Sequence, residues 1–167
     1  MTSTVFETMA DALEAREPDL RLFSGTGASF EDWCLWECFA ALRRADNWDV
    51  IPKPFYRTHC GVEGDTMGDL LVRQNGRTVF VEIGIVHSGT QNKWIDKLNN
   101  DLRKLQCIRT EGIKPMQFLV CASSCSTLTS PSWANWLEKV HGWSIDGRLS
   151  RSFGQDDRFA VYAWLIE

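Results

Sequence analysis

Apolar residues along the chain follow two periods, one typical of amphipathic helices and one typical of strands. The helical period predicts four helices, over residues 4–16, 29–44, 90–106 and 131–143. Pro18 is expected to end the first helix, because proline interrupts helical hydrogen bonding, and Ser29 is expected to cap the second. Pro131 suits the first turn of the last helix.

The strand period predicts a sheet. Its strands are an edge strand or irregular lead-in within 47–56, a hairpin over 69–86, a strand over 116–122 and a closing strand over 158–167. The almost wholly apolar run 78–86 is expected in the centre of the sheet, buried on both faces. The order of elements predicts an α/β fold with one mixed central sheet of four to five strands flanked by helices. Residues 1–167 are expected to form a single domain.

The hairpin sequence GDLLVRQNGRTVFVEIG brings two acidic residues together. Asn75-Gly76 is a strong signal for a two-residue type I′ turn, which pairs Gln74 with Arg77. The same register pairs Asp69 with Glu82, with Cβ atoms about 4.5–5.5 Å apart. Like charges in such a pair destabilise a sheet, and a divalent cation between the carboxylates would remove the repulsion. The pair is therefore a candidate metal site.

Two glutamates stand in apolar surroundings. Glu82 is the only charged residue of 78–86, and Glu37 is the only one in the helical run 33–42. Burying a lone carboxylate is unfavourable unless it is paired, protonated or bound to a cation. One site shared by Glu37, Glu82 and Asp69 would satisfy all three carboxylates.

Each of these acidic residues also has a purely structural interpretation. Asp69 would lie exposed at the start of a strand, and the two glutamates would form ordinary ion pairs. Their partners would be Arg73 for Glu82, and Lys53 or Arg57 for Glu37. The in-register pairing of Asp69 with Glu82 favours the metal site over these separate explanations.

The composition of the chain indicates which cellular compartment and which kinds of partner to expect. The net charge is −4, so the chain lacks the basic excess typical of avid non-specific nucleic-acid binding. Its 44% hydrophobic and 24% charged residues are ordinary for a globular protein. No apolar run reaches the length of a membrane span, and the N-terminal segment lacks the features of a signal peptide. A cytoplasmic protein with no membrane partner and with reduced cysteines is expected.

The motif GDLLV…VFVEIG, within residues 29–123, resembles that of the PD-(D/E)XK nuclease superfamily. The resemblance implies a restriction-endonuclease-like core, which consists of a helix, a three-strand meander, a crossover helix and a fourth strand. Residues 1–28 would add an N-terminal helix and loop. Residues 124–167 would add a C-terminal helix and the closing strand.

The resemblance also implies roles for individual residues. In that superfamily the aspartate and glutamate of the motif coordinate magnesium. The carbonyl of the residue after the glutamate often helps, and a glutamate of the first core helix frequently joins. These roles would fall on Asp69, Glu82, Ile83 and Glu37. With Mg²⁺ or Mn²⁺ bound, such a site activates water for hydrolysis of a phosphodiester.

One residue departs from the motif. The superfamily has a lysine two residues after the glutamate, whereas this chain has Gly84. That lysine stabilises negative charge during hydrolysis, so its absence would ordinarily remove most activity. Some members supply the lysine from the crossover helix, where Lys93 and Lys97 lie one turn apart in this chain. These two lysines are catalytic candidates, unless both are solvated on the surface of an amphipathic helix.

Two functions are compatible with these residues. The first is a metal-dependent nuclease with a crossover-helix lysine, acting on nucleic acid, with DNA favoured over RNA. The second is a catalytically inactive relative that binds a protein partner, as an immunity, anti-restriction or regulatory factor. Gly84, the acidic balance and the eight tryptophans support the second function. A nucleic-acid-binding module without chemistry is disfavoured because no basic stripe is evident. Assembly into a homodimer is left open.

Overall fold

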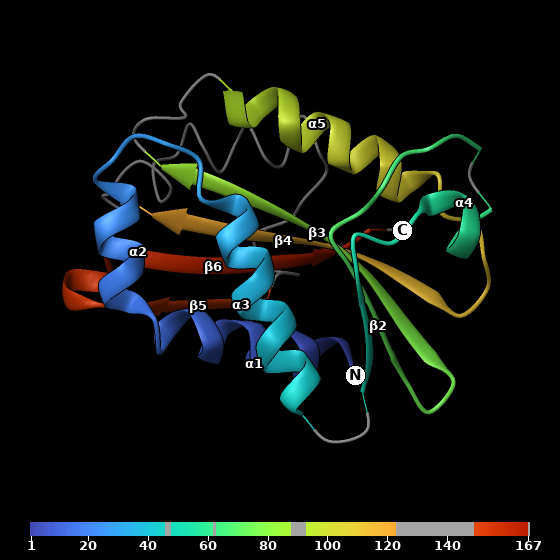
Figure 1. Cartoon of the computed structure of the whole chain (residues 1–167), viewed down its shortest axis with the longest axis horizontal. Coiled ribbons are helices and arrows are strands. Elements are labelled where there is room, and N and C mark those ends of the chain that lie inside the picture. The colour runs from blue at the N-terminus through green and yellow to red at the C-terminus, as the bar shows by residue number, and fades with distance from the viewer. Residues whose placement is uncertain (46–47, 62, 88–92, 123–148, 167) are drawn as a thin grey trace.

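A computed structural model describes residues 1–45, 48–61, 63–87, 93–122 and 149–166 (Figure 1). Within these ranges six strands form one sheet: β1 (Asp49–Pro52), β2 (Leu70–Gln74), β3 (Arg77–His87), β4 (Ile113–Ala122), β5 (Leu149–Phe153) and β6 (Phe159–Leu165). The helices of the same ranges are α1 (Thr2–Glu14), α2 (Glu17–Ser24), α3 (Glu31–Arg44), α4 (Tyr56–His59) and α5 (Lys93–Gln106), with a 3₁₀ turn at Gln155–Asp157.

The strands lie in the order β1-β2-β3-β4-β6-β5. β3 and β4 run parallel and are connected through α5, whereas the other neighbouring pairs are antiparallel. The predicted α/β class, with a mixed sheet flanked by helices, is confirmed.

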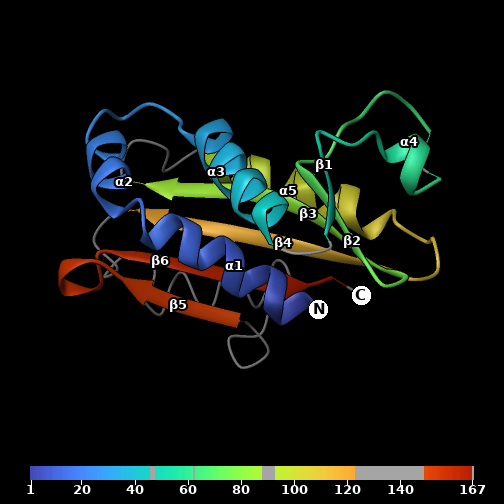
Figure 2. The same cartoon turned by 60° about the horizontal axis from the view of Figure 1, so that its bottom comes forward.

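The described sheet has six strands rather than four to five, because β5 was not predicted. Its sequence LSRSF offers only Leu149 and Phe153 as large apolar residues. It pairs along β6, which therefore lies inside the sheet instead of closing it. α1 runs alongside this edge (Figure 2), where Arg151 forms ion pairs with Glu7 and Asp11.

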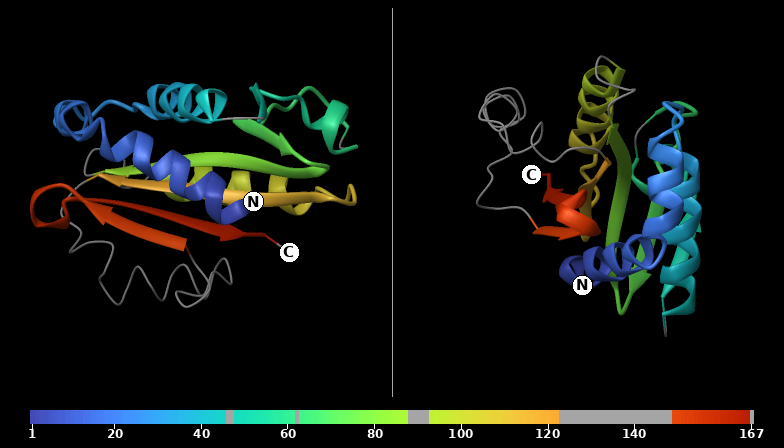
Figure 3. Two further views of the ribbon diagram at one scale, coloured as in Figure 1. Left: turned by 90° about the horizontal axis from the view of Figure 1, so that it is seen from below. Right: turned by 90° about the vertical axis from the view of Figure 1, so that its left-hand side faces the viewer.

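Helices cover both faces of the sheet (Figures 1 and 3). α1, α2 and α3 pack on one face, where their apolar side chains join Val79, Val81 and Ile83 of β3 in the larger core. α5 packs on the other face, where Leu98 and Leu102 belong to the smaller core. Alternate residues of β3 thus face two cores, as its apolar sequence predicted.

The hairpin forms with the predicted turn and register. Asn75 and Gly76 have φ values of 50° and 76°, and positive values at both positions are what a type I′ turn requires. β2 and β3 then pair in the predicted register up to Leu70 opposite Val81. The ladder ends there, one pair short of Asp69, and this early end creates the candidate site.

Two helix boundaries differ from the prediction. Pro18 does not end helical structure but lies in the first turn of α2, where its missing N–H is not needed. α3 begins at Glu31 after the N-cap residue Phe30, and no side chain caps it, so Ser29 is not the cap. The helix predicted over 131–143 lies outside the described residues.

β1, which ends at Pro52, is an edge strand as predicted. No helix of the described residues has the length and apolar character needed to cross a membrane. Four of the described cysteines are buried: Cys34, Cys38, Cys60 and Cys121.

Candidate active site

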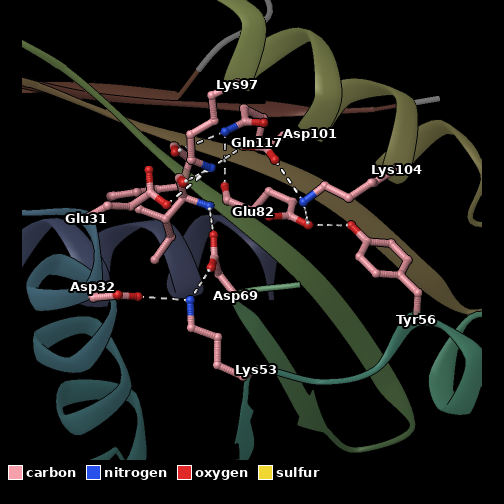
Figure 4. Close-up of polar contacts among 12 residues, drawn as sticks. Glu31, Asp32, Lys53, Tyr56, Asp69, Glu82, Lys97, Asp101, Lys104 and Gln117 are labelled. Carbon is pink, nitrogen blue, oxygen red and sulfur yellow. Dashed lines mark hydrogen bonds and ion pairs between the residues drawn. The ribbon is translucent and has the colours of Figure 1, made fainter. Parts of the chain in front are cut away.

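The candidate site lies where β3 extends past the end of β2 (Figure 4). β2 pairs with β3 only as far as Val81, whereas β4 accompanies β3 to His87. Asp69 immediately precedes β2. Its side chain takes the place of a backbone partner for β3, since Oδ2 accepts a hydrogen bond from the Ile83 N–H at 2.7 Å. Asp69 is only 5% exposed. A carboxylate is thereby fixed at the uncovered edge of β3.

Glu82 points from β3 toward α5 and is 1% exposed. Its Oε1 accepts hydrogen bonds from the Tyr56 hydroxyl at 2.6 Å and from the Lys104 ammonium group at 2.7 Å. Burial, together with the Asp101 and Asp69 carboxylates, raises the pKa of Glu82 to about 8 against the opposing effect of Lys104. The two acidic residues of the motif are therefore electrostatic neighbours with different hydrogen-bond partners.

Lys97 of α5 brings an ammonium group to the same edge. Its Nζ donates to the Ile83 carbonyl at 3.0 Å and to Asp101 at 2.5 Å, and lies 3.3 Å from Glu31 of α3. Burial alone would lower the pKa of Lys97, but the Asp101 and Glu31 carboxylates outweigh it and raise the pKa. Lys97 therefore stays charged and has the position that the prediction required, while its role stays a prediction. Lys93 is the first residue of α5, and its side chain lies outside the described part of the structure.

Two further lysines neutralise carboxylates of the cluster. Lys53 Nζ lies 3.1 Å from Oδ1 of Asp69 and 3.0 Å from Oδ1 of Asp32. Lys104, already bound to the glutamate of β3, also contacts Asp101 at 2.8 Å. The lysines thus link α3, the β1–α4 segment, β3 and α5 around one edge of the sheet.

Gly84 allows α5 to approach β3 closely. A Cβ atom at position 84 would lie 2.9 Å from Cδ2 of Leu98 and 3.3 Å from Cδ1 of Leu119, below the 3.4 Å at which ordinary contacts begin. A lysine here, as in the superfamily motif, would displace Leu98, which is 1% exposed. Leu98 therefore occupies the space that a lysine at position 84 would need, and it directly follows Lys97 in the chain.

Glu37, expected as a third ligand, is not brought into the cluster. Its side chain is 28% exposed and lies 3.6 Å from Arg16. α3 instead contributes Asp32 and Glu31, and Glu31 lies six residues before Glu37 on a different side of the helix. Burial, opposed by Lys97 and reinforced by Asp69, raises the pKa of Glu31 to about 7. Glu31 was not predicted as a site residue, because an acidic residue in a first helical turn is ordinarily explained by the helix dipole.

Asp101 and Lys104 were also missed as site residues. Only Lys93 and Lys97 of this helix were predicted to take part in the site, yet Asp101 is 1% exposed. Their spacing carried a signal, because Lys97 and Asp101 are four residues apart and Asp101 and Lys104 three, which places all three on one side of α5. That side packs over the site.

The cluster contains five carboxylates and three lysines: Glu31, Asp32, Asp69, Glu82 and Asp101, with Lys53, Lys97 and Lys104. With every group ionised its charge is −2, and the raised pKa values of Glu31 and Glu82 make it less negative at neutral pH. Among the described residues, no three Asp, Glu, His or Cys side chains gather closely enough to hold a metal ion. The oxygen atoms that could contribute to a metal site at β3 are instead those of the Asp69 and Glu82 carboxylates and the Ile83 carbonyl. Such a hard, incomplete oxygen set suits Mg²⁺, which retains water and takes substrate phosphate as further ligands.

No protein-family model matches this chain, and neither the curated proteins nor the solved structures include one that matches it.

Proposed function

We propose that this protein is a metal-dependent nuclease of the PD-(D/E)XK type, which hydrolyses phosphodiester bonds in nucleic acid. The observation that carries the proposal is the convergence of Asp69 and Lys97 on the backbone of Ile83, beside the buried Glu82. These residues supply the carboxylates, the carbonyl and the relocated lysine that such a site needs.

The topology supports the same proposal. Apart from the one-turn α4, the chain order is α3-β1-β2-β3-α5-β4, and β1 to β4 are adjacent in the sheet. This order corresponds to the helix, meander, crossover helix and fourth strand of the restriction-endonuclease-like core. Asp69 immediately precedes β2 and Glu82 lies within β3, in keeping with the strands that carry the motif in that core.

Asp69, Glu82 and the Ile83 carbonyl would hold Mg²⁺ or Mn²⁺. When bound, the ion polarises the phosphodiester and lowers the pKa of a water nucleophile. The protein's own residues prepare the site. Tyr56 and Lys104 orient Glu82, and Lys97 keeps a positive charge at the edge where negative charge develops during phosphoryl transfer.

The test is cleavage of labelled DNA and RNA, single-stranded and double-stranded, by the purified protein in MgCl₂, MnCl₂ or EDTA. We expect cleavage that requires a divalent ion and falls roughly 100-fold in Asp69→Asn and Glu82→Gln, because each change removes an anionic oxygen and keeps the side-chain shape. Asp49→Asn is the matched control, since Asp49 is an exposed carboxylate of β1 that pairs with Arg73. Cleavage that survives in both site variants would refute the proposal.

A catalytically inactive relative that binds a protein is the second candidate. Two observations favour it: the three lysines already neutralise much of the carboxylate charge, and Leu22 and Trp36 are 66% and 50% exposed. Calorimetric titration with MgCl₂ and MnCl₂ separates the candidates. Metal binding that Asp69→Asn abolishes supports the nuclease, whereas a protein that binds neither ion supports the inactive relative.

A further inference from the structure

A pocket adjoins the carboxylate–lysine cluster on the side of α3. Its volume is about 400 Å³, and it is formed by the end of α2, the loop between α2 and α3 and the first turn of α3. Three aromatic residues line it, Phe23, Phe30 and Trp33, together with two acidic ones, Glu31 and Asp32. A pocket of this size accommodates a small organic ligand.

The aromatic residues offer ring surfaces to a flat ligand. Phe23 stands edge-on to Trp33, with ring centroids 5.0 Å apart, and is stacked with Phe30 at 6.1 Å. Phe23 and Trp33 both line the pocket, and each is half-buried. Nucleobases stack on such side chains, because every base has a π-face.

The two acidic residues belong to both the pocket and the cluster. Glu31 lies 3.3 Å from Lys97, whose Nζ binds the Ile83 carbonyl. Asp32 lies 3.0 Å from Lys53, which contacts Asp69 in turn. Each acidic residue is therefore separated from a proposed metal ligand by one lysine. A ligand in the pocket would be an immediate neighbour of a phosphate bound at the cluster.

We propose that this pocket binds a nucleobase of the substrate strand, next to the phosphate that is cleaved. The proposal rests on the proposed function, which places the phosphate at the cluster. A stacked and paired base cannot enter a side pocket, so the substrate is single-stranded or locally opened at this point. The Asp32 carboxylate accepts hydrogen bonds without donating them, so it favours a base with an exocyclic amino group over thymine or uracil.

The test uses single-stranded hexamers of deoxycytidine or thymidine with uncharged methylphosphonate linkages and a fluorescein label. The acidic cluster does not repel such probes, and their binding is measured by fluorescence anisotropy in EDTA, apart from cleavage. We expect the cytosine hexamer to bind roughly tenfold more tightly than the thymine hexamer. Asp32→Asn should erase most of this preference, because an amide also donates. The Asp32 side chain is 78% exposed, so this change is not expected to disturb folding.

Stacking is tested with Trp33→Leu, which keeps an apolar side chain but removes the aromatic face. We expect it to weaken binding of the cytosine hexamer about tenfold. Trp36→Leu is the matched control, because Trp36 is exposed on the same helix and does not line the pocket. Circular dichroism and thermal melting establish that each variant is folded.

The outcomes separate the pocket from the nuclease activity. Equal affinity of the wild type for both hexamers, no binding of either, or full binding by folded Trp33→Leu overturns the pocket assignment, even where divalent-ion-dependent cleavage is observed. Conversely, base binding that requires Trp33 in a protein that cleaves no nucleic acid refutes the nuclease proposal and leaves the base pocket in place.

Discussion

Lys97 has two possible roles in the cluster, one catalytic and one structural. Its ammonium group lies on the Ile83 carbonyl, as a relocated catalytic lysine requires, but it also pairs with the buried Asp101. A lysine that only neutralised Asp101 would matter for stability, and a catalytic lysine would matter for rate. The two roles can be separated because Lys104 also contacts Asp101, at 2.8 Å, and remains when Lys97 is replaced.

Replacement of Lys97 by methionine is expected to lower kcat roughly 100-fold, because the positive charge at the reacting phosphate is lost while the apolar stem of the side chain is kept. KM should change far less. Single-turnover cleavage measures the rate, and urea unfolding measures the stability. Arg103→Gln, on the exposed side of α5, is the control. An unchanged kcat together with a clear loss of stability would show that Lys97 is only structural.

The position of α5 against β3 decides which side chains reach the site. Gly84 leaves room for Leu98, and the close contact brings Lys97 and Lys104 of the same helix over the edge of β3. Gly84 and the position of Lys97 at the edge of β3 are therefore two aspects of one packing arrangement. A side chain at position 84 would push against Leu98 and move the helix that carries both lysines.

Gly84→Ala is expected to destabilise the protein by about 1–3 kcal/mol, because the added methyl group overpacks the interface between β3 and α5. The penalty should shrink in a Leu98→Ala background, where the space is open. Urea unfolding of the two single variants and the double variant gives the coupling energy. Additive effects of the two changes would show that the side chains do not compete for the same space.

The same elements show what could be predicted from the sequence. The hairpin register was predicted because Asn75-Gly76 determines it locally, through positive φ values at both residues. The close packing of α5 against β3 was not predicted, because it depends on the space that Gly84 leaves for Leu98, which is distant in the sequence. For the same reason Glu31 and Asp101 were missed: their burial arises only when α3 and α5 meet at the edge of β3. β5 was missed because its pairing with β6 compensates for a weak apolar pattern.

Across the whole molecule, the ion pair between Glu31 and Lys97 joins helices that cover opposite faces of the sheet. It can form because β2 ends early and leaves the edge of β3 open between α3 and α5. The charged cluster therefore bridges the two layers of helices. Its ionisation should influence the stability of the entire fold, and the raised pKa values of Glu31 and Glu82 give the direction.

Stability is expected to fall as the pH rises through the raised pKa of Glu31. This carboxyl has a pKa of 4.5 when unperturbed and of about 7 in the folded protein. Between these values the folded state holds a proton that the unfolded state has released, so the free energy of unfolding decreases with pH. The decrease is on the order of 3 kcal/mol, since a tenfold change in an acid dissociation constant corresponds to about 1.4 kcal/mol.

Glu31→Gln removes this titration, so its free energy of unfolding should rise relative to the wild type between pH 4.5 and about pH 7. Urea unfolding in EDTA across this range measures the difference. Glu82→Gln should change in the same direction, over a window that extends to its own raised pKa of about 8. A difference between Glu31→Gln and the wild type that stays constant over the range would mean that the carboxylate of Glu31 ionises normally in the folded protein, and that the bridge to Lys97 is not buried in solution.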